Sequence, residues 1–186
     1  PAGAAAPSAE TISGAGKLGT TQNLTNRAAD IANYEYVSTD VTGATSATTP
    51  TSTGATTLTH GTSPQTVTYY YKRNNAGNIT VHHYEVGQST ELYKPTGATA
   101  PSAEVFDGAG KLGLSETFVN READIANYEY VSVDTSGAPG LTATGGSGQT
   151  NVVYQTGAQT VIYRYRRKNA ANITVHHYED GTTNEL

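Results

Sequence analysis

The chain has 186 residues, a net charge of −5, and 35% hydrophobic residues, so each compact region can bury only a modest core. It contains no cysteine, which excludes a disulfide framework, Cys-ligated zinc and a thiol nucleophile. An excess of acidic over basic residues argues against nucleic-acid binding, and no apolar run approaches the length of a membrane span, so we expect no membrane insertion.

The aromatic composition is unusual, with 13 Tyr, two Phe and no Trp. A Tyr ring can cover a half-buried sheet face while its hydroxyl group stays in water, which suits thin domains. A Cys-free chain rich in Tyr, Thr and Gly is typical of an exported bacterial surface protein. We therefore expect an extracellular location on a bacterial cell surface.

The sequence is a tandem repeat. A shift of 94 residues aligns the chain with itself without a gap, and 52 of 92 aligned positions are identical, which predicts two copies of one fold. The clearest matches are APSAE at 6–10 and 100–104, GAGKLG at 14–19 and 108–113, DIANYEYVS at 30–38 and 124–132, and NITVHHYE at 78–85 and 172–179.

In chain order, each repeat first carries a weak helical pattern. In the second copy Leu114, Phe118 and Ile125 follow helical spacing, and Ser115 is a candidate N-cap. Strands rich in Val, Ile, Thr and Tyr with period-two alternation follow. The expected strands are 33–40, 57–60, 65–73 and 79–85, with counterparts at 127–134, 151–155, 159–167 and 173–179. These elements predict an α+β fold dominated by a sheet.

Two boundaries between the repeats are open. The Pro- and Gly-rich segment 93–104 is typical of a linker, and NNAGN at 74–78 of a hairpin turn, which together predict domains 1–93 and 94–186. The alternative places the boundaries near 74–78 and 168–172, which leaves a hairpin without a domain at the C-terminal end. The first choice is preferred.

Neither a metal site nor an active site is predicted. In His82-His83 and His176-His177, neighbours on a strand point to opposite faces, so we expect one ring to pack and the other to be exposed. Repeated carboxylates such as Glu10 and Glu104 occupy fold-maintaining positions, and no nucleophile motif or phosphate loop accompanies them. The sequence therefore favours neither an enzyme nor a cofactor. The basic cluster Arg164, Arg166, Arg167 and Lys168 is interpreted as a solvated strand end.

We predict one covalent feature, an internal cross-link in each repeat. Each repeat carries a Lys, an Asn and an Asp that could form an internal isopeptide cross-link of the kind found in pilins and adhesins. The candidate groups are Lys17, Asn26 and Asp30, with Lys111, Asn120 and Asp124.

Tyr side chains on the strands are the candidates for ligand binding, because aromatic rings stack on the faces of sugars. The candidates are Tyr69, Tyr70, Tyr71, Tyr84, Tyr163, Tyr165 and Tyr178.

The segment QTVTYYYK at 65–72, followed by NITVHHYE at 78–85 and Glu91-Leu92, resembles the MucBP-like repeat of mucin-binding proteins of Gram-positive bacteria. IANYEYV at 31–37 is similar to the family's I-x-G-Y-x-x-V strand, with Asn33 in place of Gly. The resemblance implies a β-grasp-like fold, tandem arrays, anchoring to the cell wall through regions outside this segment, and adhesion to mucus or host glycoproteins.

Two functions are therefore carried forward. The first is an adhesive module that binds the glycans of host mucin or glycoproteins. The second is a spacer, in which neighbouring repeats form an elongated rod that projects a distal adhesive domain.

Overall fold

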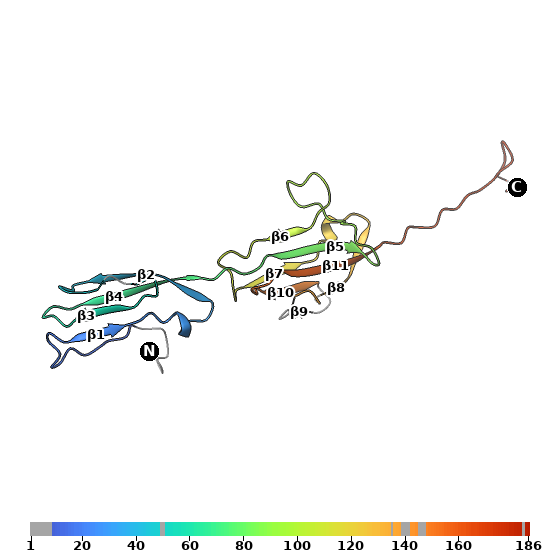
Figure 1. The fold of residues 1–186 in the computed structure, drawn as a ribbon. Helices are drawn as coiled ribbons and strands as arrows, with labels where there is room; N and C mark the ends of the chain where they lie inside the picture. The colour runs from blue at the N-terminus through green and yellow to red at the C-terminus, as the bar shows by residue number, and fades with distance from the viewer. Residues whose placement is uncertain (1–8, 49–50, 135, 139–141, 145–147, 184) are drawn as a thin grey trace. The chain divides into compact units, whose positions relative to one another are not determined.

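The computed structural model describes residues 9–48, 51–134, 136–138, 142–144, 148–183 and 185–186. The chain divides into two compact units (Figure 1). Unit 1 consists of the described part of Pro1–Ala76 together with Gly108–Gly113, and unit 2 consists of Gly77–Asp107 together with the described part of Leu114–Leu186.

Unit 1 contains two antiparallel strand pairs. In one, β1 (Thr21–Leu24) pairs with β3 (Thr56–Thr59). In the other, β2 (Tyr34–Thr42) pairs with β4 (Thr66–Arg73), and a 3-10 turn, η1 (Ala28–Asp30), precedes β2.

Unit 2 repeats these pairs and adds to them. One sheet has the order β7–β10–β9, formed by Ser115–Val119, Gln149–Val153 and Thr142–Thr144. The other has the order β6–β5–β11–β8, formed by Glu104–Phe106, Ile79–Glu85, Gln159–Arg167 and Tyr128–Asp134. The turn η2 (Glu122–Asp124) precedes β8, and β5 pairs with β11 in parallel whereas the other pairs are antiparallel.

The core of unit 2 follows from the alternation of side chains along its central strands. In β11, Val161, Tyr163 and Tyr165 are fully buried, and in β5 Ile79 and Val81 are buried beside them. Successive side chains of a strand point to opposite faces, so these residues form one continuous inner face. The ring of Phe118 in β7 packs against Phe106 of β6, with centroids 4.7 Å apart, and helps to close the core.

The predicted hairpin through NNAGN is wrong, because β5 pairs with β11 and β6 and not with β4. The chain enters unit 2 at this point, and Gly77 packs closely against the segment between β10 and β11. The Gly77 N–H donates to the carbonyl of Gln155 (2.8 Å), and a Cβ on Gly77 would lie 2.3 Å from the carbonyl carbon of Gly157.

Along the chain, the first change from unit 1 to unit 2 falls between Ala76 and Gly77, and the boundary between the repeats stays a prediction. Segment 93–104, expected to be a linker, belongs to unit 2. The ring of Tyr93 lies 5.2 Å from that of His83, and the Ser102 N–H donates to the Tyr93 carbonyl (3.0 Å).

The predicted helix near Leu114–Ile125 is also wrong, since this segment forms β7 and η2. Ser115–Val119 pairs along its length with β10, and the side chain of Asn120 then accepts the Glu122 N–H at 2.9 Å, which starts a single tight turn. In the described residues η1 and η2 are the only helical elements. The expectation of a β-dominated chain is confirmed.

Candidate binding surface

The two neighbouring histidines of β5 point to opposite faces of the sheet, as predicted. The side chain of His83 is fully buried, whereas that of His82 is 24% exposed. The pair therefore separates two environments: an inner network around His83 and an outer surface around His82.

The inner network holds the sheet to the turn that precedes η2. The His83 ring lies 2.8 Å from the Tyr165 hydroxyl and 3.1 Å from the Glu104 carboxylate. Arg121 donates to Glu104 at 2.7 Å, and its backbone N–H donates to the Tyr165 hydroxyl at 2.8 Å. The hydrogen bonds of His83 and Glu104 in this network run to partners inside the unit, which indicates a structural role.

Burial changes the pKa values of the side chains in and around this network. Burial lowers the pKa of His83 below 6.5, because it outweighs the hydrogen bond and the charge of Glu104, which raise this pKa. Burial also raises the pKa of the neighbouring Tyr163 to about 12. Burial alone would raise the pKa of Glu104, but hydrogen bonds from Arg121 and His83 outweigh it and lower that pKa. The favoured state is a neutral imidazole beside an ionised carboxylate.

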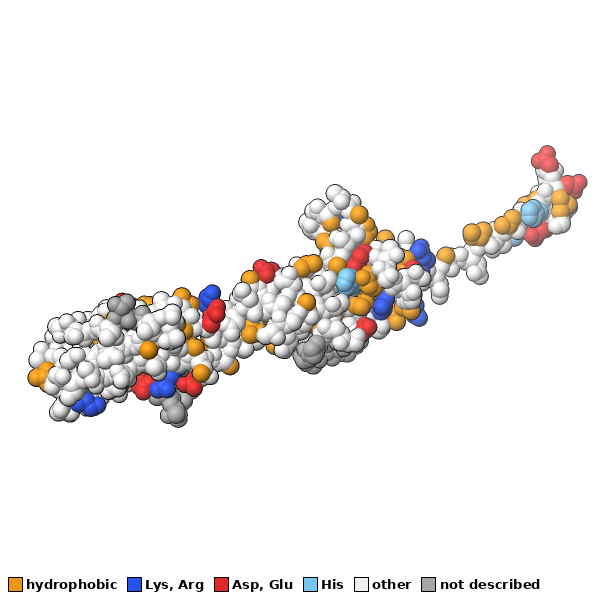
Figure 2. All heavy atoms as spheres, in the orientation of Figure 1, with side chains coloured by type: hydrophobic (Ala, Val, Ile, Leu, Met, Phe, Trp, Pro, Cys, Tyr) orange, Lys and Arg blue, Asp and Glu red, His pale blue; other side chains and the backbone are white. Residues whose placement is uncertain are grey.

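The outer face of the same sheet carries a cluster of four side chains, which we call the β5–β11 surface: His82, Tyr84, Glu91 and Arg164. The rings of His82 and Tyr84 stack with centroids 5.0 Å apart, and the Arg164 guanidinium lies 5.3 Å from the Tyr84 centroid. Both Glu91 and the Tyr84 hydroxyl contact Nδ1 of His82. Figure 2 shows a histidine side chain next to acidic and hydrophobic ones on the surface of unit 2.

The backbone fixes the geometry of the β5–β11 surface. Parallel register places Tyr84 directly beside Arg164, and an isolated bridge brings Glu91 back to Tyr84. Arg164 is held further by a hydrogen bond to the Gln88 carbonyl (2.6 Å). A partly exposed aromatic ring flanked by a guanidinium group and a carboxylate can stack on a sugar ring and hydrogen-bond its hydroxyl groups.

The outer face of β4 in unit 1 differs from that of β11 in unit 2. Tyr70, which is 51% exposed, stands at the repeat position of Arg164. An ion pair between Lys72 and Glu35 (3.0 Å) matches the pair between Arg166 and Glu129 in unit 2. Unit 1 therefore presents an exposed aromatic ring where unit 2 presents a cation.

The other predicted binding residues have different surroundings. Tyr163 and Tyr165 are fully buried, so they lie on the inner face of the sheet and not on its solvent face. Tyr69 and Tyr71 of unit 1 are half-buried. Tyr178 is 49% exposed, in a segment that has no partner strand among the described ones.

The candidate isopeptide groups have other partners in the structure. The Asn26 side chain donates to the Thr53 carbonyl and accepts the Ala28 N–H, and Asp30 lies 3.7 Å from Arg27. Lys111 belongs to unit 1, whereas Asn120 and Asp124 belong to unit 2. The cross-link stays a prediction.

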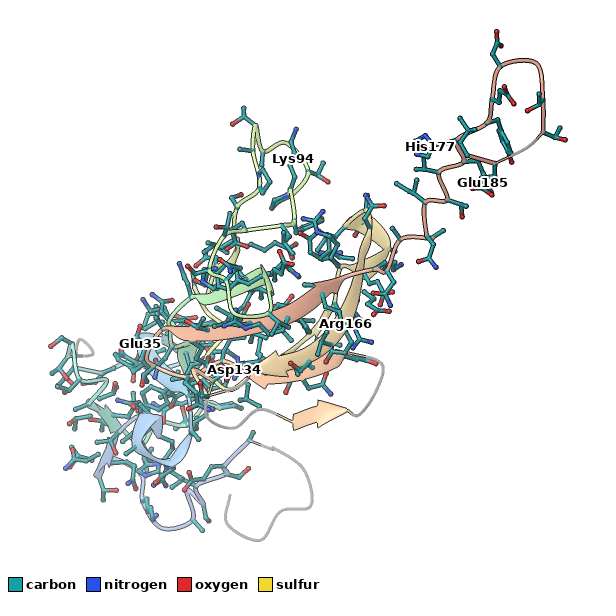
Figure 3. All side chains as sticks on the ribbon, turned by 90° about the vertical axis from the view of Figure 1, so that its right-hand side faces the viewer. Glu35, Lys94, Asp134, Arg166, His177 and Glu185 are labelled. Atoms are coloured by element: carbon teal, nitrogen blue, oxygen red, sulfur yellow. The ribbon has the colours of Figure 1, made fainter. Side chains whose placement is uncertain are left out.

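Sequence reasoning missed Arg164, His82 and Glu91 as parts of a surface. The sequence places Arg164 with its basic neighbours at a strand end, but Arg164 lies within β11. Arg166, which is labelled in Figure 3, lies on the same strand. It forms an ion pair with Glu129. The alternation of Ile162, Arg164 and Arg166 between buried positions was the signal that could have placed Arg164 on the outer face.

Among the described residues, no group of three or more His, Cys, Asp or Glu side chains is arranged to hold a metal ion. Likewise, in the part of the chain that the structure describes, no helix has the length and apolar character to span a membrane.

A model of the MucBP domain matches the chain twice, at residues 2–72 and 78–166. The interval between the two matches coincides with the division between the units at Ala76 and Gly77. No curated protein matches the sequence at a significant level. The family is one of binding domains and not of enzymes. Because the two matches cover most of its length, the chain belongs to the MucBP domain family and contains two tandem copies of that domain.

Proposed function

We propose that the chain is a repeat segment of a bacterial cell-surface adhesin and that it attaches to the glycans of host mucin or other glycoproteins. Membership of the MucBP family supports the class of function. The observation that carries the location of the site is the β5–β11 surface, where Tyr84 lies between His82 and Arg164 on a rigid sheet.

The chemistry of this surface suits an acidic glycan. Tyr84 offers a ring for stacking, and Arg164 is a permanent cation that can pair with the carboxylate or sulfate groups of mucin sugars. Single sites of this kind bind weakly, so an array that carries several such sites would have a higher apparent affinity for a ligand that carries many glycans.

The proposal extends to location and organisation. The protein acts outside a Gram-positive cell, anchored to the wall through regions outside this segment, with further β-grasp-like repeats stacked into an extended array. The family's occurrence in surface adhesins supports this placement.

The first test is the equilibrium binding of the chain to immobilised mucin. We expect saturable binding that Tyr84→Ala weakens by about tenfold, since a stacking contact contributes on the order of 1 kcal/mol or more. Tyr178→Ala is a matched control, because Tyr178 occupies the same position in the same octapeptide but lies outside the folded sheet.

Equal losses for the two variants would contradict the assignment of the site. No binding at all would contradict the adhesive function and leave the spacer as the role of this segment.

A further inference from the structure

One segment of the second domain copy belongs to the first compact unit. Residues 108–113, Gly-Ala-Gly-Lys-Leu-Gly, lie inside the second match to the MucBP model, at 78–166, yet they are part of unit 1. The chain leaves unit 1 after Ala76, returns to it with this segment, and leaves it again at Leu114. Unit 1 is therefore completed by residues that the following repeat supplies.

Backbone hydrogen bonds fix both ends of the 108–113 segment to the chain that follows β4. The Ala76 N–H donates to the Gly108 carbonyl at 2.8 Å. The Leu112 N–H donates to the Asn74 carbonyl at 3.2 Å. The partner residue moves back along the chain as the segment advances, so the two stretches run in opposite directions.

Two side chains hold the same segment. Arg73, the last residue of β4, donates to the Leu112 carbonyl at 2.9 Å. Its guanidinium also donates to the Tyr34 hydroxyl at 2.9 Å and lies 4.6 Å from the centre of that ring, which fixes the guanidinium plane. The Gly110 N–H donates to the side-chain oxygen of Asn75 at 2.9 Å. The middle of the segment is thus bound as well as its ends.

Gly113 makes the closest approach of the segment to the rest of unit 1. Its φ is +78°, and a Cβ there would lie 2.3 Å from Nδ2 of Asn33. Asn33 is itself fixed, because its carbonyl accepts the Asn74 N–H at 2.8 Å. Gly110 also has a positive φ, of +66°, but nothing lies within 4 Å of a Cβ added to it. Only Gly113 therefore depends on having no side chain in order to fit.

The surface that receives the segment consists of Asn33, Tyr34, Arg73 and Asn74, and we call it the docking surface. Its counterpart in unit 2 consists of Asn127, Tyr128, Arg167 and Lys168.

The counterpart in unit 2 has the same internal geometry. The Arg167 guanidinium lies 4.9 Å from the centre of the Tyr128 ring and donates to its hydroxyl at 2.7 Å. The Lys168 N–H donates to the Asn127 carbonyl at 2.8 Å. Lys168 keeps the backbone carbonyl that Asn74 offers in unit 1, so the change of side chain leaves that acceptor in place. The docking surface is therefore a feature of the repeat and not of unit 1 alone.

We propose that the docking surface of each repeat receives the Gly-Ala-Gly-Lys-Leu-Gly segment of the next repeat along the chain, and that this contact couples the stability of neighbouring repeats. The segment and the surface both recur at fixed places in the repeat, so one kind of joint serves every junction of an array. Nearest-neighbour coupling of this kind makes unfolding along an array more cooperative. The inference does not depend on glycan binding, because the docking surface belongs to unit 1 and the β5–β11 surface to unit 2.

The first test compares two glycines of the segment by native-state hydrogen exchange of the whole chain, measured by mass spectrometry. Gly113→Ala and Gly110→Ala add the same methyl group at a left-handed position, but only the first meets Asn33. We expect the amides of β2 and β4 to exchange about tenfold faster in Gly113→Ala than in Gly110→Ala. Equal exchange in the two variants would overturn the inference.

The second test measures whether unit 1 responds when unit 2 unfolds. Phe118 is buried in β7, so Phe118→Ala should unfold unit 2 at a urea concentration that leaves the natural chain folded. Docking of the segment must then close a flexible loop, residues 77–107, and we expect β2 and β4 to lose about tenfold in protection. Thr117→Ala, at an exposed position of the same strand, is the control and should leave both units folded at that concentration.

The double variant of Gly113→Ala and Phe118→Ala separates this route of coupling from any other. Because docking is already weakened, unfolding of unit 2 should cost unit 1 little further protection, so the two substitutions should not be additive. Natural protection of β2 and β4 in Phe118→Ala, or additive losses in the double variant, would also overturn the inference. None of these measurements involves a glycan, so their outcome is independent of the mucin-binding experiment.

Discussion

His83 is the residue whose chemistry depends most on the fold. Its ring is enclosed by Tyr163, Tyr93 and Tyr165, and Glu104 and Arg121 complete its surroundings. An identical residue in an identical octapeptide, His177, lies in an exposed segment. The difference comes from the partner strand and not from local sequence.

This burial predicts a stability that depends on pH. The pKa of His83 is lowered in the folded state, so as the pH falls through 6.5 the unfolded chain takes up a proton that the folded chain resists. The free energy of unfolding of unit 2 should therefore be fully developed above pH 6.5 and should decrease below it. Glu104, whose pKa is also lowered, adds a further loss below pH 4.5.

The measurement is urea unfolding at several pH values between 7.5 and 5. His83→Gln should remove most of the dependence in this range, whereas His176→Gln, at an exposed site, should leave it unchanged. A natural chain whose stability is constant from pH 7.5 to 5 would contradict the burial of a neutral imidazole.

At the scale of elements, contact between the two sheets of unit 2 depends on Gly148. This residue precedes β10 with a φ of +63°, and a Cβ there would lie 2.5 Å from the Asn120 side chain and 3.1 Å from the Tyr130 ring. Gly54 repeats the arrangement in unit 1, where a Cβ would lie 2.9 Å from the Tyr36 ring. Both units therefore bring a loop backbone directly onto a tyrosine of the opposite sheet.

Gly148→Ala should lower the free energy of unfolding by roughly 2–4 kcal/mol, because it combines a strained backbone with a collision. Gly87→Ala is the control: its φ is +77°, but nothing lies within 4 Å of the added methyl group. It should cost only about 1–2 kcal/mol, the strain alone. Equal losses in chemical denaturation would show that the contact with Tyr130 contributes nothing.

The alternation of side-chain types along the sequence predicted the central strands correctly. The strand expected at 159–167 forms as β11 with those bounds, and that expected at 79–85 forms as β5. Asn33 and Asn127 have a left-handed backbone conformation (φ of 66°). Asn and Gly both tolerate this conformation, which explains why Asn can stand where the family has Gly.

Other elements could not be predicted, because their structure depends on distant partners. Ser115–Val119 becomes a strand by pairing with β10, whose residues are 30 to 38 positions away, against a local pattern that favours a helix. The parallel pairing of β5 with β11, which creates the β5–β11 surface, joins segments about 80 residues apart. No pattern in one strand indicates which edge it will meet, so the surface around Tyr84 was only partly predicted.

At the scale of the whole molecule, the same octapeptide sequence occurs twice in the chain, in two different structural environments. Asn78–Glu85 includes a central strand of unit 2, and its copy at Asn172–Glu179 is exposed. Tandem repetition thus places one copy of the octapeptide in a completed sheet, whose outer face is the proposed glycan-binding surface, and the other copy in an exposed segment.

Hydroxyl-radical footprinting of the chain with and without saturating mucin tests the proposed surface most directly, because it reports on both copies of the octapeptide in one sample. The account predicts that mucin reduces the labelling of Tyr84 and His82 several-fold, while the labelling of Tyr178 at the same protein concentration changes little. Unchanged labelling of Tyr84 under bound mucin, or equal protection of Tyr84 and Tyr178, would contradict it.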